Sequence, residues 1–599
     1  MRVALVLALA ALFGGAASVD VWWESAVVYQ IYPRSFMDSN GDGIGDLNGI
    51  TQKLSYLKNL GVDAIWLSPI YKSPMQDFGY DITDYTAIAE EYGTMENFDT
   101  LVAEAKKLGI RIVLDYVPNH TSPESEWFVK STQREGKYTD YYIWANGTVD
   151  PNNASRTVPP NNWVSVFRKS AWEYNRMRDQ YYLHQFATGQ PDINYRSADL
   201  RQEMQDVLRF WLRKGVSGFR IDAVNYLFEV DPARYNGRYP DEPPSGEGSS
   251  PDDYEYLNHI YTRDQDETYG VVYDWRDVLD EFTVSSGESK LMVTEAYTTL
   301  EMMMRYYGNA TRTGSVPFNF VYLGSINSTT DAAGLKSAID QWMNNMPAGR
   351  VANWVNGNHD QSRMATRYGM KRVDAMNMLA LILPGITFTY QGEELGMTDD
   401  VIPWAVTVDP QACNTEDPIE YWRHSRDPAR SPFHWDSSAH AGFTRGNTTW
   451  LPVASNYRTV NVAYESAQLK SHYHFYKDVV ALKHTPAVKS GRLATHAVAD
   501  DVFVVTRIPS GANERAILGV INLSATPYSL DLTQMAGASQ ELTVMASGVD
   551  CTLAKNAVVQ RNRIELPGNC ALVLRSAAHR LIGSFSVFVV LYFVYKFLV

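Results

Sequence analysis

Four acidic residues stand directly after short apolar runs or at their ends, namely Asp115, Asp222, Glu295 and Asp360. Asp222 is the most informative because Arg220 lies two positions earlier, and in an extended strand both side chains point to the same face. A nearby cation favours the ionised carboxylate, which is the form a nucleophile needs. Taken alone, this segment is equally a structural Asp–Arg pair at the end of a strand.

The elements that must position these carboxylates alternate between apolar runs and amphipathic stretches. We expect buried strands at 27–32, 64–67, 111–117, 218–221, 291–295 and 386–390, with helices such as 52–60, 97–108 and 200–214 between them. This alternation predicts an α/β fold of parallel βα units, and its length favours a closed (β/α)8 TIM barrel. Because the carboxyl ends of barrel strands meet at one mouth, the four acidic groups are expected to converge there.

Three stretches depart from the barrel pattern. Residues 121–190 are rich in Trp, Tyr, Asn and Pro and indicate an inserted lobe after the third strand, whereas 235–253 has the composition of an exposed loop. From 489 the pattern changes to short alternating runs, which predict a C-terminal all-β domain, a β-sandwich over 489–576. The barrel itself is assigned to 18–120 and 191–488.

With these motifs in place, the chain resembles family 13 of the glycoside hydrolases, the α-amylase family. The segments 115–120, 219–222, 291–295 and 356–361 are similar to its four signature regions, and 190–194 to a fifth. Segments 28–36, 78–82 and 425–432 resemble insect and bacterial α-glucosidases (maltases) of the oligo-1,6-glucosidase type. The resemblance extends from about residue 21 to residue 576.

The resemblance implies a retaining double displacement on α-linked glucosides. Asp222 would attack the anomeric carbon, Glu295 would act as general acid and then base, and Asp360 would bind the sugar in the transition state. Retaining enzymes place the nucleophile and the acid/base about 5 Å apart. Arg220 would keep Asp222 ionised, while neighbouring carboxylates would raise the pKa of Glu295.

Further substrate contacts follow from the same resemblance. The implied substrate-binding residues are Tyr80, Asp81, His120, Arg220, His359 and Arg426. Tyr80 would stack on the terminal glucose while Asp81 and Arg426 hold its far hydroxyls, so that the pocket accepts chain ends only. Ala223, directly after the nucleophile, resembles the small residue of members that prefer α-1,4 linkages. The implied substrates are α-1,4-linked oligosaccharides, with sucrose as a further candidate.

An Asp- and Gly-rich loop near the N-terminus predicts a structural calcium site. Oxygen-bearing side chains alternate from Asp38 to Asp46, and this spacing can wrap a backbone around one hard cation. The resemblance implies one Ca²⁺ bound through Asp38, Asn40, Asp42, the Ile44 carbonyl and Asp46. The alternative is an ordinary turn of Asp, Asn and Gly.

Both ends of the chain carry targeting features. Arg2, the apolar run 3–13 and the small residues 15–17 predict a signal peptide over 1–17. Residues 577–599 are largely apolar and follow small residues, which favours a GPI-attachment signal over a single membrane helix. We therefore expect a protein of the secretory pathway held at the extracellular face of the plasma membrane by a C-terminal lipid anchor.

Other features agree with secretion. Sequons predict N-glycosylation at Asn146, Asn153, Asn309, Asn327, Asn447 and Asn522. A seventh sequon, at Asn119, is expected to be buried and unused. Cys551 and Cys570 are candidates for a disulfide between neighbouring strands, which leaves Cys413 over.

Charge and motif content separate the function classes. The net charge of −15 argues against a nucleic-acid partner. An exo-α-glucosidase is the preferred function, and the alternative is a cell-surface binding or receptor protein on an amylase-like fold, as in the heavy subunits of amino-acid transporters. Those heavy subunits lack the catalytic set, which is complete here. Oligomeric state and a secondary role in docking luminal proteins stay open.

Overall fold

The computed structural model describes residues 19–577 apart from 249 and 512. The predicted signal peptide and residues 578–599 of the predicted anchor signal lie outside these residues. Eight parallel strands form one sheet in the order β13-β12-β11-β5-β2-β1-β15-β14. Their bounds are β1 Val27–Ile31, β2 Ala64–Leu67, β5 Arg111–Tyr116, β11 Gly218–Ile221, β12 Leu291–Thr294, β13 Val316–Pro317, β14 Asn353–Val355 and β15 Ile386–Tyr390. The predicted parallel barrel is confirmed.

A side chain bridges the one gap in this barrel, between β13 and β14. The Nδ2 of Asn353 donates to the carbonyl of Pro317 at 2.6 Å, and its Oδ1 accepts from the backbone N–H of Asn319 at 2.9 Å. Asn353 is fully buried, so its amide does the work of ladder hydrogen bonds. Strand β13 was not predicted, because two residues carry too little pattern to be recognised.

Helices surround the barrel, and several of them begin with capping residues of the kind typical of helix N-termini. The longer ones are α2 Leu47–Leu60, α3 Met95–Lys107, α5 Ala198–Arg213, α6 Glu267–Ser286, α9 Ala332–Asn345, α11 Val373–Ile382 and α15 His472–Val480. Asp46 caps α2 by accepting the N–H of Gly49, and Thr94 forms a capping box with Asn97 at the start of α3. Such caps satisfy backbone donors that the first turn leaves free.

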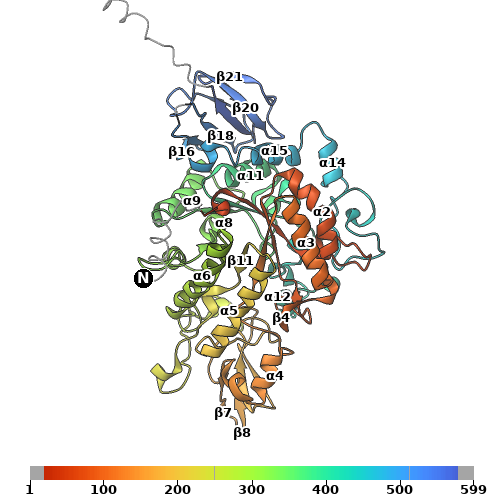
Figure 1. Cartoon of the computed structure of the whole chain (residues 1–599), viewed down its shortest axis with the longest axis vertical. Coiled ribbons are helices and arrows are strands. Elements are labelled where there is room, and N and C mark those ends of the chain that lie inside the picture. Colours follow the sequence, from red (N-terminus) through yellow and green to blue (C-terminus); the bar gives the residue numbers. More distant parts are fainter. Residues whose placement is uncertain (1–18, 249, 512, 578–599) are drawn as a thin grey trace, which may run out of the picture.

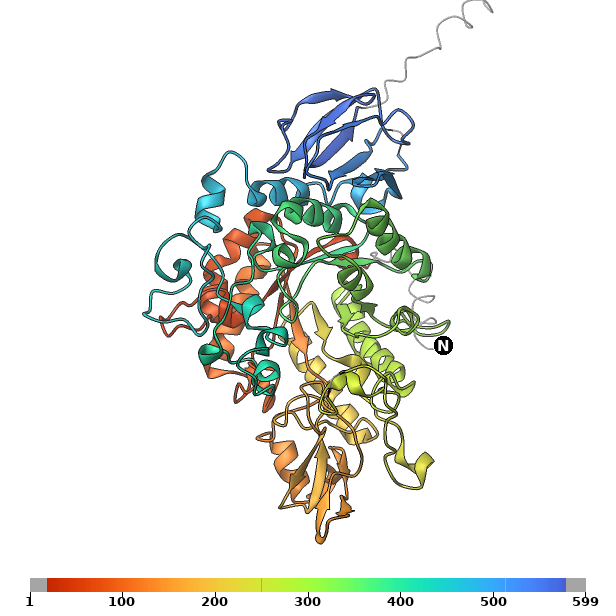
Figure 2. The ribbon, with the colours of Figure 1, turned by 180° about the vertical axis from the view of Figure 1, so that it is seen from behind.

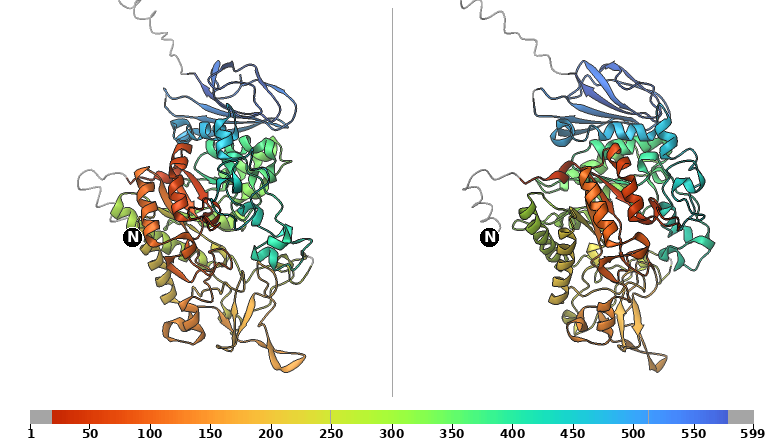
Figure 3. Two further views of the ribbon diagram at one scale, coloured as in Figure 1. Left: turned by 90° about the vertical axis from the view of Figure 1, so that its right-hand side faces the viewer. Right: turned by 45° about the vertical axis from the view of Figure 1, so that its right-hand side comes forward.

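The inserted lobe follows β5, as predicted. It contains α4 Glu126–Thr132, a three-stranded sheet of β6 Trp144–Ala145, β10 Gln180–Leu183 and β9 Trp172–Asn175, and the hairpin of β7 Thr148–Asp150 and β8 Asn153–Val158. A small aromatic core that includes Trp163 and Trp172 holds the lobe together. In the side views of Figure 3 the hairpin extends away from the barrel at the end opposite to the C-terminal domain.

The C-terminal domain is an antiparallel β structure, as predicted. Its main sheet has the order β16-β17-β18-β23-β20-β21, with bounds Arg492–Ala499, Val502–Ile508, Ile517–Asn522, Ala571–Ser576, Glu541–Ser547 and Val558–Gln560. A second pair, β19 Tyr528–Leu530 and β22 Ile564–Leu566, encloses a separate core on one face. The other face contributes Phe503, Val505 and Val573 to the core of the barrel.

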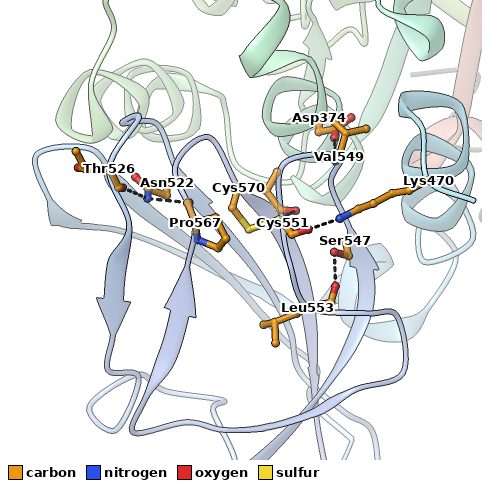
Figure 4. The surroundings of a disulfide bond; sticks show 11 residues. Asp374, Lys470, Asn522, Thr526, Ser547, Val549, Cys551, Leu553, Pro567 and Cys570 are labelled. Carbon is orange, nitrogen blue, oxygen red and sulfur yellow. Dashed lines mark hydrogen bonds between the residues drawn. A yellow bond between two sulfur atoms is a disulfide. The ribbon is translucent and has the colours of Figure 1, made fainter.

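The predicted disulfide between Cys551 and Cys570 is present and is drawn in Figure 4. It joins the segment after β20 to the residue before β23. Near it, the predicted glycosylation of Asn522 is wrong for the folded domain. Asn522 is 1% exposed, and its Nδ2, the atom that would carry a glycan, donates to the carbonyls of Thr526 and Pro567. The other five predicted sequon asparagines are exposed.

The three parts are arranged along the long axis of the molecule. Figure 1 shows the C-terminal sheet at one end, the barrel in the middle and the lobe at the other end. Helices α11 and α15 lie between the barrel and the sheet in this view and in the view from behind (Figure 2). Within residues 19–577, leaving out 249 and 512, no helix is long and apolar enough to cross a membrane.

Candidate active site

The guanidinium of Arg220 binds three of the four strand-end carboxylates. Its Nη1 contacts Oδ1 of Asp115 at 2.8 Å and Oδ1 of Asp222 at 2.5 Å, and its Nη2 contacts Oε2 of Glu295 at 2.5 Å. The register of β5, β11 and β12 places the ends of these strands side by side. Since one buried cation faces three anions, this end of the barrel retains an excess of negative charge.

The pKa of Asp222 is raised, which differs from the expected low value. Burial raises this pKa well above its ordinary value; Arg220 lowers it, and Glu295 and Asp115 raise it again. Asp115 shows the same balance, since burial raises its pKa to about 6 against the pull of Arg220. Arg220 therefore favours the ionised nucleophile, but it is shared among three carboxylates and does not outweigh burial.

The backbone after the nucleophile is held in an unusual conformation. Ala223 has φ 45° and ψ 38°, a left-handed geometry that costs a non-glycine residue about 1–2 kcal/mol. Its N–H donates to Oε2 of Glu295 at 3.1 Å, and the N–H of Val224 donates to the carbonyl of Glu295 at 3.0 Å. These bonds fix the turn after Asp222 against Glu295, and such strain is frequent at functional sites.

Asp360 lies in a cationic environment, unlike Asp222. Its Oδ1 accepts from Arg430 at 2.9 Å and from Arg426 at 3.2 Å, and its Oδ2 lies 3.3 Å from Nε2 of His359. Burial raises the pKa of Asp360, but His359, Arg430 and Arg426 together lower it below its ordinary value. Asp360 is thus the carboxylate that stays ionised, and Arg430 is a contributor that the sequence did not single out.

A chain of hydrogen bonds fixes the protonation of His359. Gln30 donates to its Nδ1 at 2.8 Å, so the proton of the neutral ring is assigned to Nε2, which contacts Tyr80 Oη at 2.6 Å. The hydroxyl of Tyr80 donates in turn to Oδ2 of Asp115 at 3.1 Å. Burial lowers the pKa of His359 well below its ordinary value. The ring therefore acts as a neutral, fixed donor.

His120 is also held neutral. It is 1% exposed, and burial lowers its pKa to about 3. Its Nε2 lies 3.1 Å from Nε2 of Gln190. The neighbouring Asn119 is buried, as expected, and its Nδ2 donates to Oδ1 of Asp192 at 3.1 Å. This sequon is therefore inaccessible in the folded protein.

Asp81 does not reach the site, and Asp77 takes the position expected of it. The carboxylate of Asp81 accepts from the N–H groups of Gln76 and Asp77 and from the hydroxyl of Ser73, and the residue is fully buried. Asp77 instead contacts Nη2 of Arg426 at 3.0 Å. The prediction for Asp81 is wrong because its carboxylate closes the turn formed by 73–80.

These residues surround one cavity of about 430 Å³, a volume within the range of small-molecule sites. The predicted residues that line it are Tyr80, His120, Asp222, Ala223, Glu295, Asp360 and Arg426. Arg220 and His359 lie behind this lining and act through their contacts with Asp222, Tyr80 and Asp360. A second hollow of about 740 Å³ lies between the hairpin of β3 Tyr71–Lys72 and β4 Asp84–Ile88 and helices α4 and α5, and it contains none of the predicted site residues.

Several residues of the site were missed by sequence reasoning: Asp77 and Gln190 line the cavity, and Asp409 contacts the lining residue Arg426. Asp77 and Gln190 face each other across a 3.1 Å hydrogen bond, and Asp409 accepts from Arg426 at 2.6 Å. Gln190 was already part of the segment 190–194, so its motif was recognised but not its contact. Asp409 lies in a segment without periodicity and carried no signal.

The predicted calcium loop is closed by its own hydrogen bonds. Asp38 accepts three backbone N–H groups of the loop, Oδ1 of Asp42 accepts the N–H of Ile44 at 2.8 Å, and Asp46 caps α2. The donor set consists of oxygen atoms only, which fits a hard cation. In the part of the chain that the structure describes, no three His, Cys, Asp or Glu side chains are grouped closely enough to hold a metal ion. Calcium therefore stays a prediction.

The chain belongs to the α-amylase family of glycoside hydrolases. Residues 30–491 match the model of the alpha amylase catalytic domain. Maltase A1 of Drosophila melanogaster is 53% identical over 525 residues, 87% of this chain and 90% of that protein. The alpha-glucosidase of Apis mellifera is 41% identical over 585 residues, 96% of this chain and 99% of that protein.

Two further likenesses bear on function. A solved alpha-glucosyl transfer enzyme superposes with a TM-score of 0.80 at 33% identity, covering 93% of this chain and all of that one. The human amino acid transporter heavy chain SLC3A1 is 38% identical over 506 residues, 84% of this chain and 70% of that protein. The binding-protein alternative predicts a lost catalytic set, whereas Asp222, Glu295 and Asp360 all line the cavity here.

Proposed function

We propose that this protein is an exo-acting, retaining α-glucosidase that releases glucose from the non-reducing ends of α-1,4-linked oligosaccharides. The observation that carries the proposal is the joint contact of Asp222 and Glu295 with the two terminal nitrogens of Arg220. Both carboxylates therefore lie beside one guanidinium at the barrel mouth, and retaining enzymes use such a close pair, about 5 Å apart, as nucleophile and acid/base. The insect relatives named maltase and alpha-glucosidase support the same activity.

The first step forms a covalent glucosyl–enzyme. Arg220 engages Oδ1 of Asp222, so Oδ2 is assigned the attack on the anomeric carbon. The bond between this carbon and the leaving oxygen breaks, and Glu295 gives that oxygen a proton. Because Oε2 of Glu295 is held by Arg220 and by the N–H of Ala223, Oε1 is assigned the transferred proton.

The second step restores the enzyme. Glu295 takes a proton from a water molecule, the water oxygen bonds to the anomeric carbon, and the ester bond to Asp222 breaks. Two inversions give glucose with its original anomeric configuration. Asp360, which stays ionised, supplies an acceptor for sugar hydroxyls while positive charge develops on the ring.

A closed end of the cavity accounts for exo action. Arg426 spans this end, with its Nη2 bound to Asp77 at 3.0 Å and to Asp409 at 2.6 Å and its Nη1 bound to Asp360 at 3.2 Å. Such a network can present fixed donors and acceptors to the far hydroxyls of a terminal glucose, and we expect it to block a further sugar beyond them.

Hydrolysis of maltose by the purified protein tests the proposal, with the first-formed anomer of glucose followed by NMR. We expect α-glucose first, and we expect Asp222→Asn and Glu295→Gln each to lower kcat by at least about a thousandfold. Isomaltose, sucrose and longer maltodextrins assayed alongside would rank the substrates. Full activity in either variant, or β-glucose as the first product, would contradict the assignment.

The calcium loop and the ends of the chain complete the proposal. One Ca²⁺ bound by Asp38, Asn40, Asp42, Ile44 and Asp46 would stabilise the first βα loop, and a chelator should then lower the melting temperature.

We further propose secretion and a GPI anchor, on the strength of the patterns over 1–17 and 577–599 and of the relatives named salivary alpha-glucosidase. Release of the full-length protein from cells by a phosphoinositide-specific phospholipase tests the anchor, and a pull-down from luminal extract tests for protein ligands.

A further inference from the structure

The loop expected to be exposed, 235–253, contains a carboxylate that is almost fully buried. Glu242 is 2% exposed. Its Oε1 accepts from the N–H of Tyr261 at 3.0 Å, and from the N–H and the hydroxyl of Thr262 at 3.1 and 2.9 Å. Its Oε2 lies 2.7 Å from Nδ1 of His259. A buried carboxylate with this many partners holds two distant parts of a loop together.

His259, which contacts Glu242, also contacts both the ring and the backbone of Tyr254. The imidazole, 5% exposed, stacks on Tyr254 with ring centroids 3.6 Å apart and planes inclined by 8°. Its Nε2 lies 2.6 Å from the carbonyl of the same Tyr254. Because a carbonyl only accepts, Nε2 carries a proton, and the 2.7 Å contact of Nδ1 with Oε2 of Glu242 requires a second proton between these two atoms. Ring and backbone of Tyr254 are therefore both fixed by His259.

The inserted lobe holds Glu242 from the other side. The amide of Asn162 exchanges two hydrogen bonds with the backbone of Glu242, at 2.8 and 2.9 Å, and Trp163 donates to the carbonyl of Pro240 at 2.9 Å. The lobe thus sets the position of Glu242, and Glu242 sets that of His259.

Tyr254 lines the catalytic cavity, and a row of aromatic contacts separates it from the closed end. Arg426 lies over Phe167 at 5.0 Å, and Phe167 contacts Phe186 at 5.8 Å. Phe186 in turn contacts Tyr226 at 5.2 Å, whose hydroxyl is 3.3 Å from that of Tyr254. The row therefore leads along the cavity wall from the glucose-binding end to Tyr254.

We propose that Glu242 and His259 are positioning residues for the part of the cavity that receives the leaving sugar. They hold Tyr254 against Tyr226, so that the two rings form a fixed wall for the second glucose of the substrate. This inference rests on the proposed α-glucosidase function, since the closed end must hold the first glucose. Neither residue lines the cavity, and both act through Tyr254.

Three variants test this role. His259→Phe keeps a ring under Tyr254 but removes both polar contacts, and Glu242→Ala removes the carboxylate. Glu242→Gln keeps an acceptor for Thr262 and offers an amide N–H to Nδ1 of His259, so it should act as a rescue. The matched control is His472→Phe, because His472 forms a partly buried pair of the same 2.7 Å length with Asp374 and does not line the cavity.

The measurements are KM and kcat for maltose and Ki for 1-deoxynojirimycin, which fills only the glucose position. We expect His259→Phe and Glu242→Ala to raise KM for maltose about fivefold or more, with Ki changed less than about twofold. Glu242→Gln and His472→Phe should keep both constants near the wild-type values. A merely structural role would move KM and Ki together.

The outcomes separate the two claims. If wild type hydrolyses maltose but KM stays unchanged in His259→Phe and Glu242→Ala, or if Ki rises in parallel with KM, the positioning role is wrong and the proposed function stands. If wild type releases no glucose from maltose, both claims fall. Melting curves of each variant show whether it is folded. If Glu242→Ala does not fold, the positioning role is decided by His259→Phe, in which KM should rise, compared with Glu242→Gln, in which KM should not.

Discussion

At the scale of single residues, the site pairs two kinds of carboxylate at one barrel mouth. Asp222 and Glu295 share Arg220 with Asp115, whereas Asp360 contacts two arginines, Arg426 and Arg430. Burial raises the pKa of Asp222 but the cations lower that of Asp360. The pKa of Asp222 therefore depends on the protonation of its neighbours, whereas Asp360 stays charged during the reaction.

Replacement of Asp115 by Asn should move the acid limb of the pH profile to lower pH. Activity is lost as pH falls through the pKa of Asp222, because the protonated acid is no nucleophile. Asp115 is one of the groups that raise this pKa, and its own pKa of about 6 means that its charge acts above that pH. We expect kcat/KM of the residual activity to persist at lower pH than in wild type. An acid limb that stays in place or moves upward would contradict this electrostatic account.

Ala223→Val should both destabilise the protein and change linkage preference. A β-branched residue at φ 45° adds strain, which we expect to lower the free energy of unfolding by about 1–2 kcal/mol. The family resemblance associates Val at this position with α-1,6 linkages, so the isomaltose-to-maltose ratio of kcat/KM should rise. Ala223→Gly is the control, since glycine adopts this φ freely and should leave the stability close to that of wild type.

At the scale of elements, the sequence predicted those strands and helices that have a clear pattern of apolar and polar residues. The strand residues 64–67, 218–221 and 386–390 were predicted to the residue, because their apolar runs are bounded by polar ends. Strand β13 was missed since two residues have no period. Asp81 was predicted from its place in the segment 78–82, and Asp77 just outside that segment was not considered; only the fold decides which of the two carboxylates faces Arg426. The buried Glu242 likewise lay in a segment whose composition suggests solvent exposure.

The disulfide should stabilise the C-terminal sheet without affecting catalysis. It closes a loop of 19 residues, for which loop entropy gives about 3 kcal/mol. The cavity is lined only by residues between 77 and 426. We expect the double variant Cys551→Ser and Cys570→Ser to unfold at lower temperature or denaturant concentration, while kcat/KM for maltose stays within about twofold of wild type. A large loss of activity in folded protein would show coupling between the sheet and the site.

At the scale of the whole molecule, the lobe and the C-terminal sheet sit at opposite ends of the barrel (Figure 1). The lobe provides Phe167, Phe186 and Gln190 to the cavity, so it is part of the site. The C-terminal domain provides no lining residue; it shares a core with the barrel and makes polar contacts with it, such as the ion pair of Asp550 with Lys371. The barrel and lobe therefore form the catalytic unit, and the C-terminal sheet packs against the barrel at the end opposite to the lobe.

Glycan mapping tests which of the predicted glycosylation sites are exposed on the surface of the folded protein. In protein from a eukaryotic secretory host, glycopeptides should carry glycans only at exposed sequons, which are Asn146, Asn153, Asn309, Asn327 and Asn447. Asn119 and Asn522 should be unmodified, because their side-chain amides are bound inside the fold. A fully occupied glycan at Asn522 in active protein would contradict the described packing of this domain.

The most direct test of the central claim is to identify the residue that carries the sugar during turnover. Reaction with 5-fluoro-α-D-glucosyl fluoride should let the glucosyl–enzyme accumulate, because the fluorine slows its hydrolysis. After proteolysis, mass spectrometry should find one fluoroglucosyl group on the peptide that contains Asp222, attached to that side chain. A label on Glu295 or Asp360, or an active enzyme that forms no covalent adduct, would contradict the account.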